Sequence, residues 1–337
     1  MDKEFNSVKS LGIQTVSTSL TICDIIGAWK VRWGIGRMNY TVTPGLYAVG
    51  RPNKDSPILV SANYKLTFDI LRKNLSGIDC WLLILDTKGV NVWCAAGKGT
   101  FGTEELVTRI EAVELANVVS HKNIILPQLG APGIDSNEVK RRTGFAVIFG
   151  PVRAEDIQAF ILSGNKATEE MRLVKFTLKD RLTLTPMEIV PAVKMSLPIL
   201  GLLFLTNRFT KRPFDKQDLA DYAGAIFSGA VLTPLLLPYI PGKAFAWKGF
   251  FIGFICTIGS LWKSKRFAQD YRLLSVGKLL LFPAISSFLA MNFTGASTYT
   301  SPSGVKKEMQ KALPFIAIAA AIGTVLMFGV HLFGRKK

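Results

Sequence analysis

The sequence has little cysteine and histidine, the two residue types that most often hold transition metals. Its 337 residues include four cysteines, none of them in a C-x-x-C pair, and two histidines, His121 and His331. Cysteines this few and this far apart exclude a disulfide framework, argue against an iron–sulfur cluster and fit a reducing compartment. Two histidines exclude a histidine-rich zinc or iron site and argue against a Cys/His hydrolase.

Phosphate-binding motifs are also lacking. The stretch "CAAGKGT" would need a glycine at Val92 and a serine or threonine at Gly99 to form a phosphate-binding loop. The run "GKGTFG" lacks the G-x-G-x-x-G spacing of a dinucleotide site. Neither run therefore predicts a nucleotide-binding site. The sequence also has no N-terminal secretory signal pattern, from which we expect that the first half lies in the cytoplasm.

Acidic residues become scarce after about residue 187, where long apolar runs recur. Each run approaches the roughly 20 residues that a helix needs to cross a bilayer, and runs such as "AGAIFSGAVLTPLLLPYI" have no polar face. The first run is the weakest, because Glu188 and Lys194 lie at its leading edge, and the others offer few charged side chains. The predicted spans are residues 187–206, 219–239, 243–262, 273–293 and 313–333.

The net charge of +17 does not indicate a nucleic-acid partner, because much of the basic excess lies in "NRFTKRPFDK", "KSKRFAQDYR" and the tail "GRKK". Membrane proteins keep basic residues in such short connectors. Basic connectors are usually found on the cytoplasmic side of a membrane. These connectors lie on the side opposite the first half, so the distribution of charge argues mildly against a cytoplasmic first half. We give the missing signal more weight and expect a multi-pass protein of the cytoplasmic membrane.

The first half alternates between strand and helix patterns after residue 56, although the first 50 residues are hard to assign. Such alternation predicts a Rossmann-like α/β domain, a parallel sheet with helices on both faces, over residues 1–185, followed by an all-helical transmembrane domain over 186–337. Ligands of such sheets bind in the loops after the strands. The predicted strands are residues 57–62, 78–86, 123–127 and 145–151, and the predicted helices are 65–75, 103–119, 135–142 and 153–162.

Cys94 lies in the longest of the loops that follow these strands, within "NVWCAAGKGT". Small residues follow it, as expected where something broad and flat approaches the backbone, and a thiolate there can bind a soft or borderline metal. Most free cysteines are instead small buried side chains, and we expect that role for Cys80, Cys23 and Cys256.

The stretch "NVWCAAGKGTFGTEEL" resembles the cap-helix signature of the HgcA family, the membrane-anchored corrinoid proteins of microbial mercury methylation. The similarity extends through "DSPILVSANYKLTFDILR", "SHKNIILPQLGAPG", "GFAVIFGPVRAEDI" and "KATEEMRLVKFTLKDRLTLTP". The wider relatives are the corrinoid iron–sulfur proteins of the acetyl-CoA pathway. This chain lacks their cluster cysteines and the length for their barrel domain, and it has no D-x-H-x-x-G histidine of ordinary cobalamin binders.

The resemblance implies a cobalt corrinoid over the carboxyl ends of the strands, with Cys94 as the lower axial ligand of cobalt. A strongly donating thiolate raises electron density on the metal, which favours departure of a methyl group with its electron pair. The residues that we expect to contact the cofactor are Ala62, Asn63, Asn91, Val92, Trp93, Ala95, Ala96, Gly97, Lys98, Gly99, Thr100, Gln128, Leu129, Gly130, Ala131, Gly150, Pro151 and Val152.

The function implied is a corrinoid-dependent methyltransferase that forms methylmercury from Hg(II). Its methyl group is expected from methyltetrahydrofolate through another methyltransferase. Since the chain has no redox cluster, it also requires a ferredoxin-like iron–sulfur reductant of the HgcB type. Two alternatives remain: a membrane-anchored corrinoid carrier that serves another methyltransferase or one-carbon pathway, and a transporter with a nucleotide-binding regulatory domain. A transporter would require broken or charged spans with paired polar residues.

Overall fold

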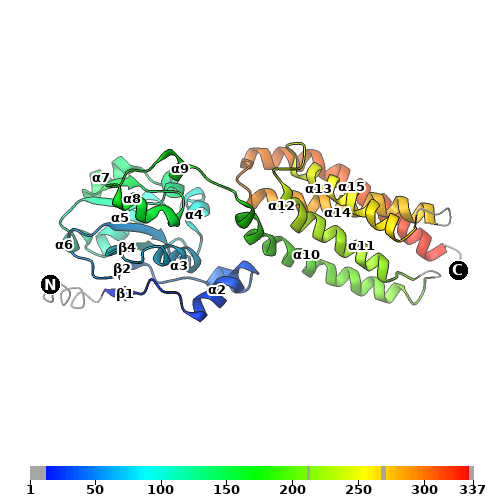
Figure 1. The fold of residues 1–337 in the computed structure, drawn as a ribbon, viewed down its shortest axis with the longest axis horizontal. Coiled ribbons are helices and arrows are strands. Elements are labelled where there is room, and N and C mark those ends of the chain that lie inside the picture. The colour runs from blue at the N-terminus through cyan, green and yellow to red at the C-terminus, as the bar shows by residue number, and fades with distance from the viewer. Residues whose placement is uncertain (1–12, 211–212, 267–270, 334–337) are drawn as a thin grey trace. The chain divides into compact units, whose positions relative to one another are not determined.

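The computed structural model describes residues 13–210, 213–266 and 271–333, and the chain divides into two compact units (Figure 1). The first unit holds the described residues up to Val31 together with Ile35–Val174. The second holds Arg32–Gly34 and the chain from Lys175 onward.

The first unit is built on a six-stranded sheet with the strand order β1-β2-β4-β3-β5-β6. The four predicted strands are present, and they pair in parallel, as expected. The sheet as a whole is mixed, because β2 pairs antiparallel with β4 and places Val49 opposite Cys80. The strands are β1 (Gln14–Val16), β2 (Gly45–Val49), β3 (Ile58–Ala62), β4 (Cys80–Leu85), β5 (Asn123–Leu126) and β6 (Ala146–Phe149).

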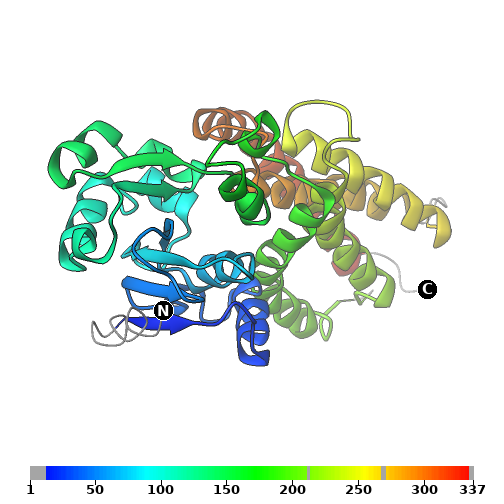
Figure 2. The ribbon, with the colours of Figure 1, turned by 60° about the vertical axis from the view of Figure 1, so that its left-hand side comes forward.

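Helices cover both faces of the sheet (Figure 2). One face packs against α4, α5, α6 and α7, and the other packs against α3 and α8. Every residue of β3 and β4 is buried, as expected for strands covered on both sides. These helices are α3 (Lys65–Lys73), α4 (Val92–Lys98), α5 (Thr103–Ala112), α6 (Leu115–Val118), α7 (Ser136–Thr143) and α8 (Ile157–Leu162).

The prediction of one helix over residues 103–119 was wrong. Glu114 adopts a left-handed conformation with φ of 46°, which interrupts the helix and separates α5 from α6. The first 50 residues, left unassigned from the sequence, contribute β1, β2, helix α2 (Ile22–Arg32) and a 3₁₀ turn at Arg37–Asn39. Further 3₁₀ turns lie at Gln128–Gly133 and Ala154–Asp156, and the short helix α9 (Glu169–Arg172) ends the unit.

The second unit is helical. Within the described ranges, five helices are long and apolar enough to cross a membrane: Leu178–Thr206, Lys216–Leu236, Phe245–Lys263, Arg272–Ala296 and Ser303–Phe333. The most apolar window of the fourth is 61% buried, against 11% for the first and the last, so the fourth forms the centre of the bundle. The elements are α10 (Leu178–Thr206), α11 (Lys216–Phe227), a π-turn (Ser228–Leu232), α12 (Thr233–Leu236), α13 (Phe245–Lys263), α14 (Arg272–Asn292), a 3₁₀ turn (Phe293–Ala296) and α15 (Pro302–Phe333).

Small residues let α13 approach α14 closely. A Cβ atom on Gly249 would lie 2.6 Å from the backbone oxygen of Ser286, and one on Gly253 would lie 2.6 Å from the Ser286 Cβ. These glycines are four residues apart, the small-xxx-small spacing that lets membrane helices pack with little separation. The Ser286 hydroxyl also donates a hydrogen bond to the Gly249 carbonyl across this contact.

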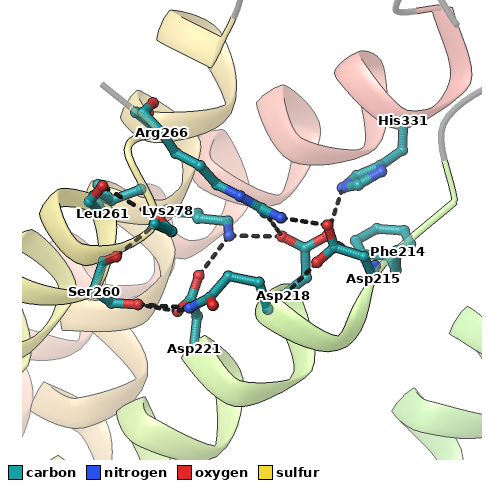
Figure 3. A network of polar contacts seen from close by, with 12 residues as sticks. Phe214, Asp215, Asp218, Asp221, Ser260, Leu261, Arg266, Lys278 and His331 are labelled. Carbon is teal, nitrogen blue, oxygen red and sulfur yellow. Dashed lines mark hydrogen bonds and ion pairs between the residues drawn. The ribbon is translucent and has the colours of Figure 1, made fainter. Parts of the chain in front are cut away.

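A buried network of charged side chains joins the helices of this unit, contrary to the expectation that the later spans carry little charge (Figure 3). Lys278 of α14 is fully buried, and its Nζ lies 2.6 Å from Asp218 Oδ1 and 2.5 Å from Asp221 Oδ2, both on α11. Arg266, after α13, pairs with Asp218 and Asp215, and His331 Nε2 of α15 lies 3.7 Å from Asp218 Oδ2. Four helical segments therefore meet at one charged centre.

Substitution of Lys278 with methionine is expected to destabilise the helical unit. The change leaves Asp218 and Asp221 buried beside each other without the cation that lies between them, and breaking a buried ion pair costs about 3–5 kcal/mol. Thermal unfolding of the purified protein in detergent should show the loss as a lowered Tm. Lys263→Met, at the exposed end of α13, is the matched control and should leave the Tm unchanged. Equal Tm values for both variants would contradict a stabilising role for the network.

Candidate functional site

Cys94 lies in the first turn of α4, a short helix that follows β4, and not in an irregular loop as expected. The Asn91 side chain caps this helix by accepting a hydrogen bond of 2.9 Å from the Cys94 backbone N–H. The side chain of Cys94 is exposed, whereas Val92, Ala95 and Ala96 on the other side of the helix are buried. The sequence therefore fixes the helix through its cap and its apolar side, and it leaves the thiol facing outward.

The residues around Cys94 are small for different physical reasons. Ala95 and Ala96 belong to the hydrophobic core, and a Cβ on Gly133 would lie 3.3 Å from the Ala96 Cα, so α4 packs closely on the turn at Gln128–Gly133. Gly99 ends the helix in the left-handed conformation with φ of 78°. Gly97 differs from these, because it is exposed and a Cβ there would meet nothing within 4 Å. The surface one turn beyond Cys94 is therefore open at Gly97.

A cavity of about 280 Å³ borders α4 at the carboxyl ends of the parallel strands. Its lining is mostly apolar, and it brings together seven of the predicted cofactor residues, from three loops that are far apart in the sequence. Cys94 does not line it, because its side chain faces away. The seven residues are Asn91, Val92, Trp93, Leu129, Gly150, Pro151 and Val152.

The remaining predicted contacts lie outside this cavity, and the side chains of Asn63, Gln128 and Thr100 have hydrogen-bond partners within the protein, Thr100 donating to the Ala95 carbonyl. The Asn63 side chain accepts hydrogen bonds from the Thr87 and Gly89 backbone N–H groups and donates one to Asp86, which ties the end of β3 to the loop after β4. The Gln128 side chain accepts a hydrogen bond from Arg172. The others are Ala62, which is buried at the end of β3, and Ala95, Ala96, Gly97, Lys98, Gly99, Gly130 and Ala131.

Gly130 was expected to let a cofactor approach the backbone, but the structure gives its small size another reason. A Cβ there would lie 2.5 Å from the ring of Phe101, which is fully buried. Gly150 is similar, because a Cβ would lie 3.1 Å from the Ile125 side chain. Larger residues at these positions would therefore disturb the core, and the loss of cofactor from such variants would not by itself locate the pocket.

Sequence reasoning missed several residues that line the cavity. Arg153 directly follows the predicted contacts Gly150, Pro151 and Val152, so its position carried a signal. Ser61 in β3 and Thr67 in α3 also line the cavity. These two hydroxyls lie within regular elements, and nothing in the periodicity of either element distinguishes them.

The four cysteines differ in exposure. Cys80 is fully buried in β4, as expected. Cys23 and Cys256 are exposed, so the expectation that they are packed structural residues was wrong. Burial, with a smaller contribution from the charge of Asp79, raises the pKa of the Cys80 thiol to about 12.

Alkylation of the folded protein by iodoacetamide at pH 8 should modify Cys94 and spare Cys80. Because the pKa of Cys80 is about 12, roughly one in 10⁴ of its side chains carries the reactive thiolate at this pH, and the thiol is also inaccessible. Peptide mass spectrometry after a time course gives both rates, and alkylation of both thiols after unfolding is the control. Comparable rates in the folded protein would contradict the burial of Cys80.

The donor set around Cys94 fits one kind of metal. Among the described residues, no group of three or more His, Cys, Asp or Glu side chains comes together to hold an ion. A bare Zn²⁺ or iron ion needs at least three protein ligands. A metal already held in the plane of a macrocycle needs one axial donor and a flat approach, which Cys94 and the open surface at Gly97 provide.

Residues 33–161, which contain β2 to β6 and the whole candidate site, match the protein family described as CO dehydrogenase/acetyl-CoA synthase delta subunit. The chain from Lys175 onward lies outside this match.

Individual relatives have the same kind of name. The chain is 33% identical over 122 residues to the acetyl-CoA decarbonylase/synthase complex subunit gamma of Methanopyrus kandleri, which covers 36% of this chain and 26% of that protein. For the subunit of the same name from Methanocaldococcus jannaschii, the identity is 32% over 127 residues, covering 37% of this chain and 26% of the relative. The Archaeoglobus fulgidus subunit is 30% identical over 122 residues, which again cover 36% of this chain and 26% of the relative. The chain spans about a quarter of the length of these relatives.

Proposed function

We propose that this chain is a membrane-anchored corrinoid protein that transfers a methyl group to Hg(II) and forms methylmercury. The observation that carries the proposal is the exposed thiol of Cys94 on a capped helix at the strand ends, beside the open surface at Gly97. Similarity to acetyl-CoA decarbonylase/synthase subunits supports methyl-group chemistry, and the resemblance of "NVWCAAGKG" to the mercury-methylating family supplies the acceptor.

The bound corrinoid would supply a cobalt-bound methyl group that can leave with its electron pair. The thiolate of Cys94 would be the protein donor to the metal of this group, and Asn91 holds the backbone of the first turn of α4 through its cap. The open space at Gly97 would leave room for the group beside the helix. The mostly apolar cavity lined by Val92 and Trp93 would hold apolar parts of the group.

The five candidate spans support a location in a membrane. We place the protein in the cytoplasmic membrane with the α/β unit in the cytoplasm, as the lack of a secretory signal pattern led us to expect. There the chain would receive methyl groups from methyltetrahydrofolate through a second methyltransferase. A ferredoxin-like reductant of the HgcB type would restore the cofactor after each transfer, because the chain's own cysteines form no cluster. Nucleic acid has no part in this function.

A second candidate function is that of a methyl carrier for another enzyme. The names of the relatives favour it, since they describe subunits of a complex that makes or cleaves acetyl-CoA. The carrier and the mercury methyltransferase share the whole cofactor site, and they differ in the group that accepts the methyl.

One experiment separates these functions. The full chain is purified anaerobically in detergent, its visible spectrum is recorded, and it is loaded with a methylated corrinoid and mixed with Hg(II) bound to small thiols. The proposal predicts a corrinoid spectrum and methylmercury in an amount close to that of the loaded cofactor. A corrinoid spectrum without methylmercury would favour the carrier, and a colourless protein that takes up no corrinoid would overturn both.

A further inference from the structure

Helix α2 exposes a stripe of large apolar side chains. Ile22, Ile25, Ile26 and Trp29 are 75%, 58%, 48% and 57% exposed, respectively. Their spacing of three, four and seven residues places them within an arc of roughly 100° at about 100° per residue. A continuous apolar face of this size on a water-soluble surface indicates an interaction site.

The opposite side of α2 is held firmly against the α/β unit. Asp24, which is buried, receives Lys65 Nζ at 2.5 Å and Arg72 Nη2 at 2.8 Å, both from the neighbouring helix α3 (Figures 1 and 2). Val31 is also buried, and Gly27 lies so close to Tyr40 that a Cβ would be 2.4 Å from its hydroxyl oxygen. The apolar stripe therefore faces outward because the helix cannot turn.

The pKa of Asp24 accords with this anchoring. Burial alone would raise the pKa, but hydrogen bonds from Lys65, Thr21 and Arg72 outweigh burial and hold it well below the ordinary value. A lowered pKa means that the ion pairs stabilise the fold above the unfolded pKa of about 4 and are lost only as the pH falls far below it. Anchoring of α2 is complete at neutral pH.

A basic residue flanks the stripe. Lys30 is exposed and lies roughly 80° to one side of the stripe's centre at the helical rotation of about 100° per residue. No acidic residue follows Asp24 on this helix. An apolar stripe with a cation along its edge complements a phospholipid surface, where the lipid chains take up the stripe and the phosphates attract the cation.

A short segment joins the α/β unit to the first candidate span. Five residues, 173–177, separate α9 from α10, the first candidate span, and they extend at most ~17 Å. The charged first two to three turns of α10 add about 14 Å before its apolar part begins. The α/β unit is therefore tethered within a few tens of ångströms of the lipid.

We propose that α2 is a membrane-interface helix, with Ile22, Ile25, Ile26 and Trp29 inserted among the lipid chains of an anionic bilayer. Lys30 reaches the phosphate groups at one edge of the stripe. The helix gives the α/β unit a second attachment to the membrane besides the spans. This inference depends on α2 and the tether, and it stands whether or not the chain methylates mercury.

The test measures the depth of a spin label on α2 in the full chain. A background with Cys23→Ser, Cys94→Ser and Cys256→Ser leaves only Cys80, which is buried, and Ile25→Cys then carries the label. The protein is placed in nanodiscs of phosphatidylcholine and phosphatidylglycerol at a ratio of three to one. Relaxation of the spin label by oxygen shows that the label lies in lipid, and relaxation by a water-soluble nickel chelate shows that it lies in water. Lys140→Cys, exposed on α7 of the same unit, is the control.

At Ile25→Cys the label should be relaxed more strongly by oxygen than by the nickel chelate, and at Lys140→Cys the order should reverse. Adding Ile22→Asp and Ile26→Asp should return the Ile25→Cys label to water, and since both positions are exposed these changes leave the fold intact. Equal nickel accessibility at the two labelled positions would overturn the proposal. A label at Ile25→Cys that is shielded from both reagents would also overturn it, because that result indicates a protein contact in place of lipid.

Discussion

The Cys94→Ala variant is expected to remain folded while its transfer of methyl groups to Hg(II) falls to background. The side chain of Cys94 is exposed and belongs to no hydrophobic cluster, so its loss removes little packing. The backbone N–H of residue 94 still donates to Asn91, so the helix keeps its cap. The variant loses the thiol beside the open surface at Gly97, and with it the electron donation that is proposed to favour departure of the methyl group.

Cys80→Ala is the matched control for this variant. Cys80 is fully buried in β4, so its truncation leaves a small cavity and lowers stability by about 1–2 kcal/mol, as other large-to-small core changes do. Its methylmercury yield per folded, cofactor-loaded protein should match the wild type. Wild-type methylation by Cys94→Ala would remove the assigned role of the thiol, and a loss of methylation in both variants would point to folding as the cause.

Turnover beyond one methyl group per cofactor is expected to require an external electron donor. Transfer of a methyl group with its electron pair leaves the metal oxidised by two electrons relative to the state that accepts the next methyl cation. The sequence offers four widely separated cysteines and no C-x-x-C pair, so we expect the chain to take these electrons from a partner. The isolated protein should therefore stop after one equivalent.

A chemical reductant of low potential, or a ferredoxin-like protein with its own reductant, should restore cycling when a methyl donor is also present. The measurement is methylmercury formed per corrinoid over time, with and without the reductant, and the oxidised ferredoxin serves as the control. Several equivalents from the pure chain without any reductant would contradict this requirement.

The strands and helices around the site could be predicted from the sequence because their patterns are strong and local. The runs that form β3, β4, β5 and β6 are continuously apolar and separated by helical periodicity, so both the strands and their parallel pairing followed. The start of α4 was less evident, since only a side-chain cap at Asn91 distinguishes its first turn from a loop.

Other features depend on contacts between distant segments. β2 is five residues long and is recognised only through its pairing with β4, and α2 is held by an aspartate whose partners lie 41 and 48 residues further along the chain. Small residues were attributed to a ligand, whereas Ala95 and Ala96 belong to the hydrophobic core and Gly130 is small because the ring of Phe101 packs against it. Composition cannot distinguish these two reasons.

The charged centre of the helical unit was missed for a similar cause. Asp221 and Lys278 lie 57 residues apart, and each is a single charge inside an apolar run. Helix packing turns the two isolated charges into a buried pair.

Broken and charged spans were the features required of a transporter, and the π-turn at Ser228–Leu232 and this network provide both. The network is satisfied within the protein, and the cavity beside Cys94 together with the similarity of residues 33–161 favours methyl transfer.

Cobalt X-ray absorption on the full chain, purified anaerobically with its corrinoid, tests the central claim most directly. The wild-type protein and Cys80→Ala should both show one sulfur neighbour at cobalt, and Cys94→Ala should show nitrogen or oxygen neighbours alone. Absence of sulfur at cobalt in the wild type, or its persistence in Cys94→Ala, would contradict the assignment of Cys94 as the axial ligand.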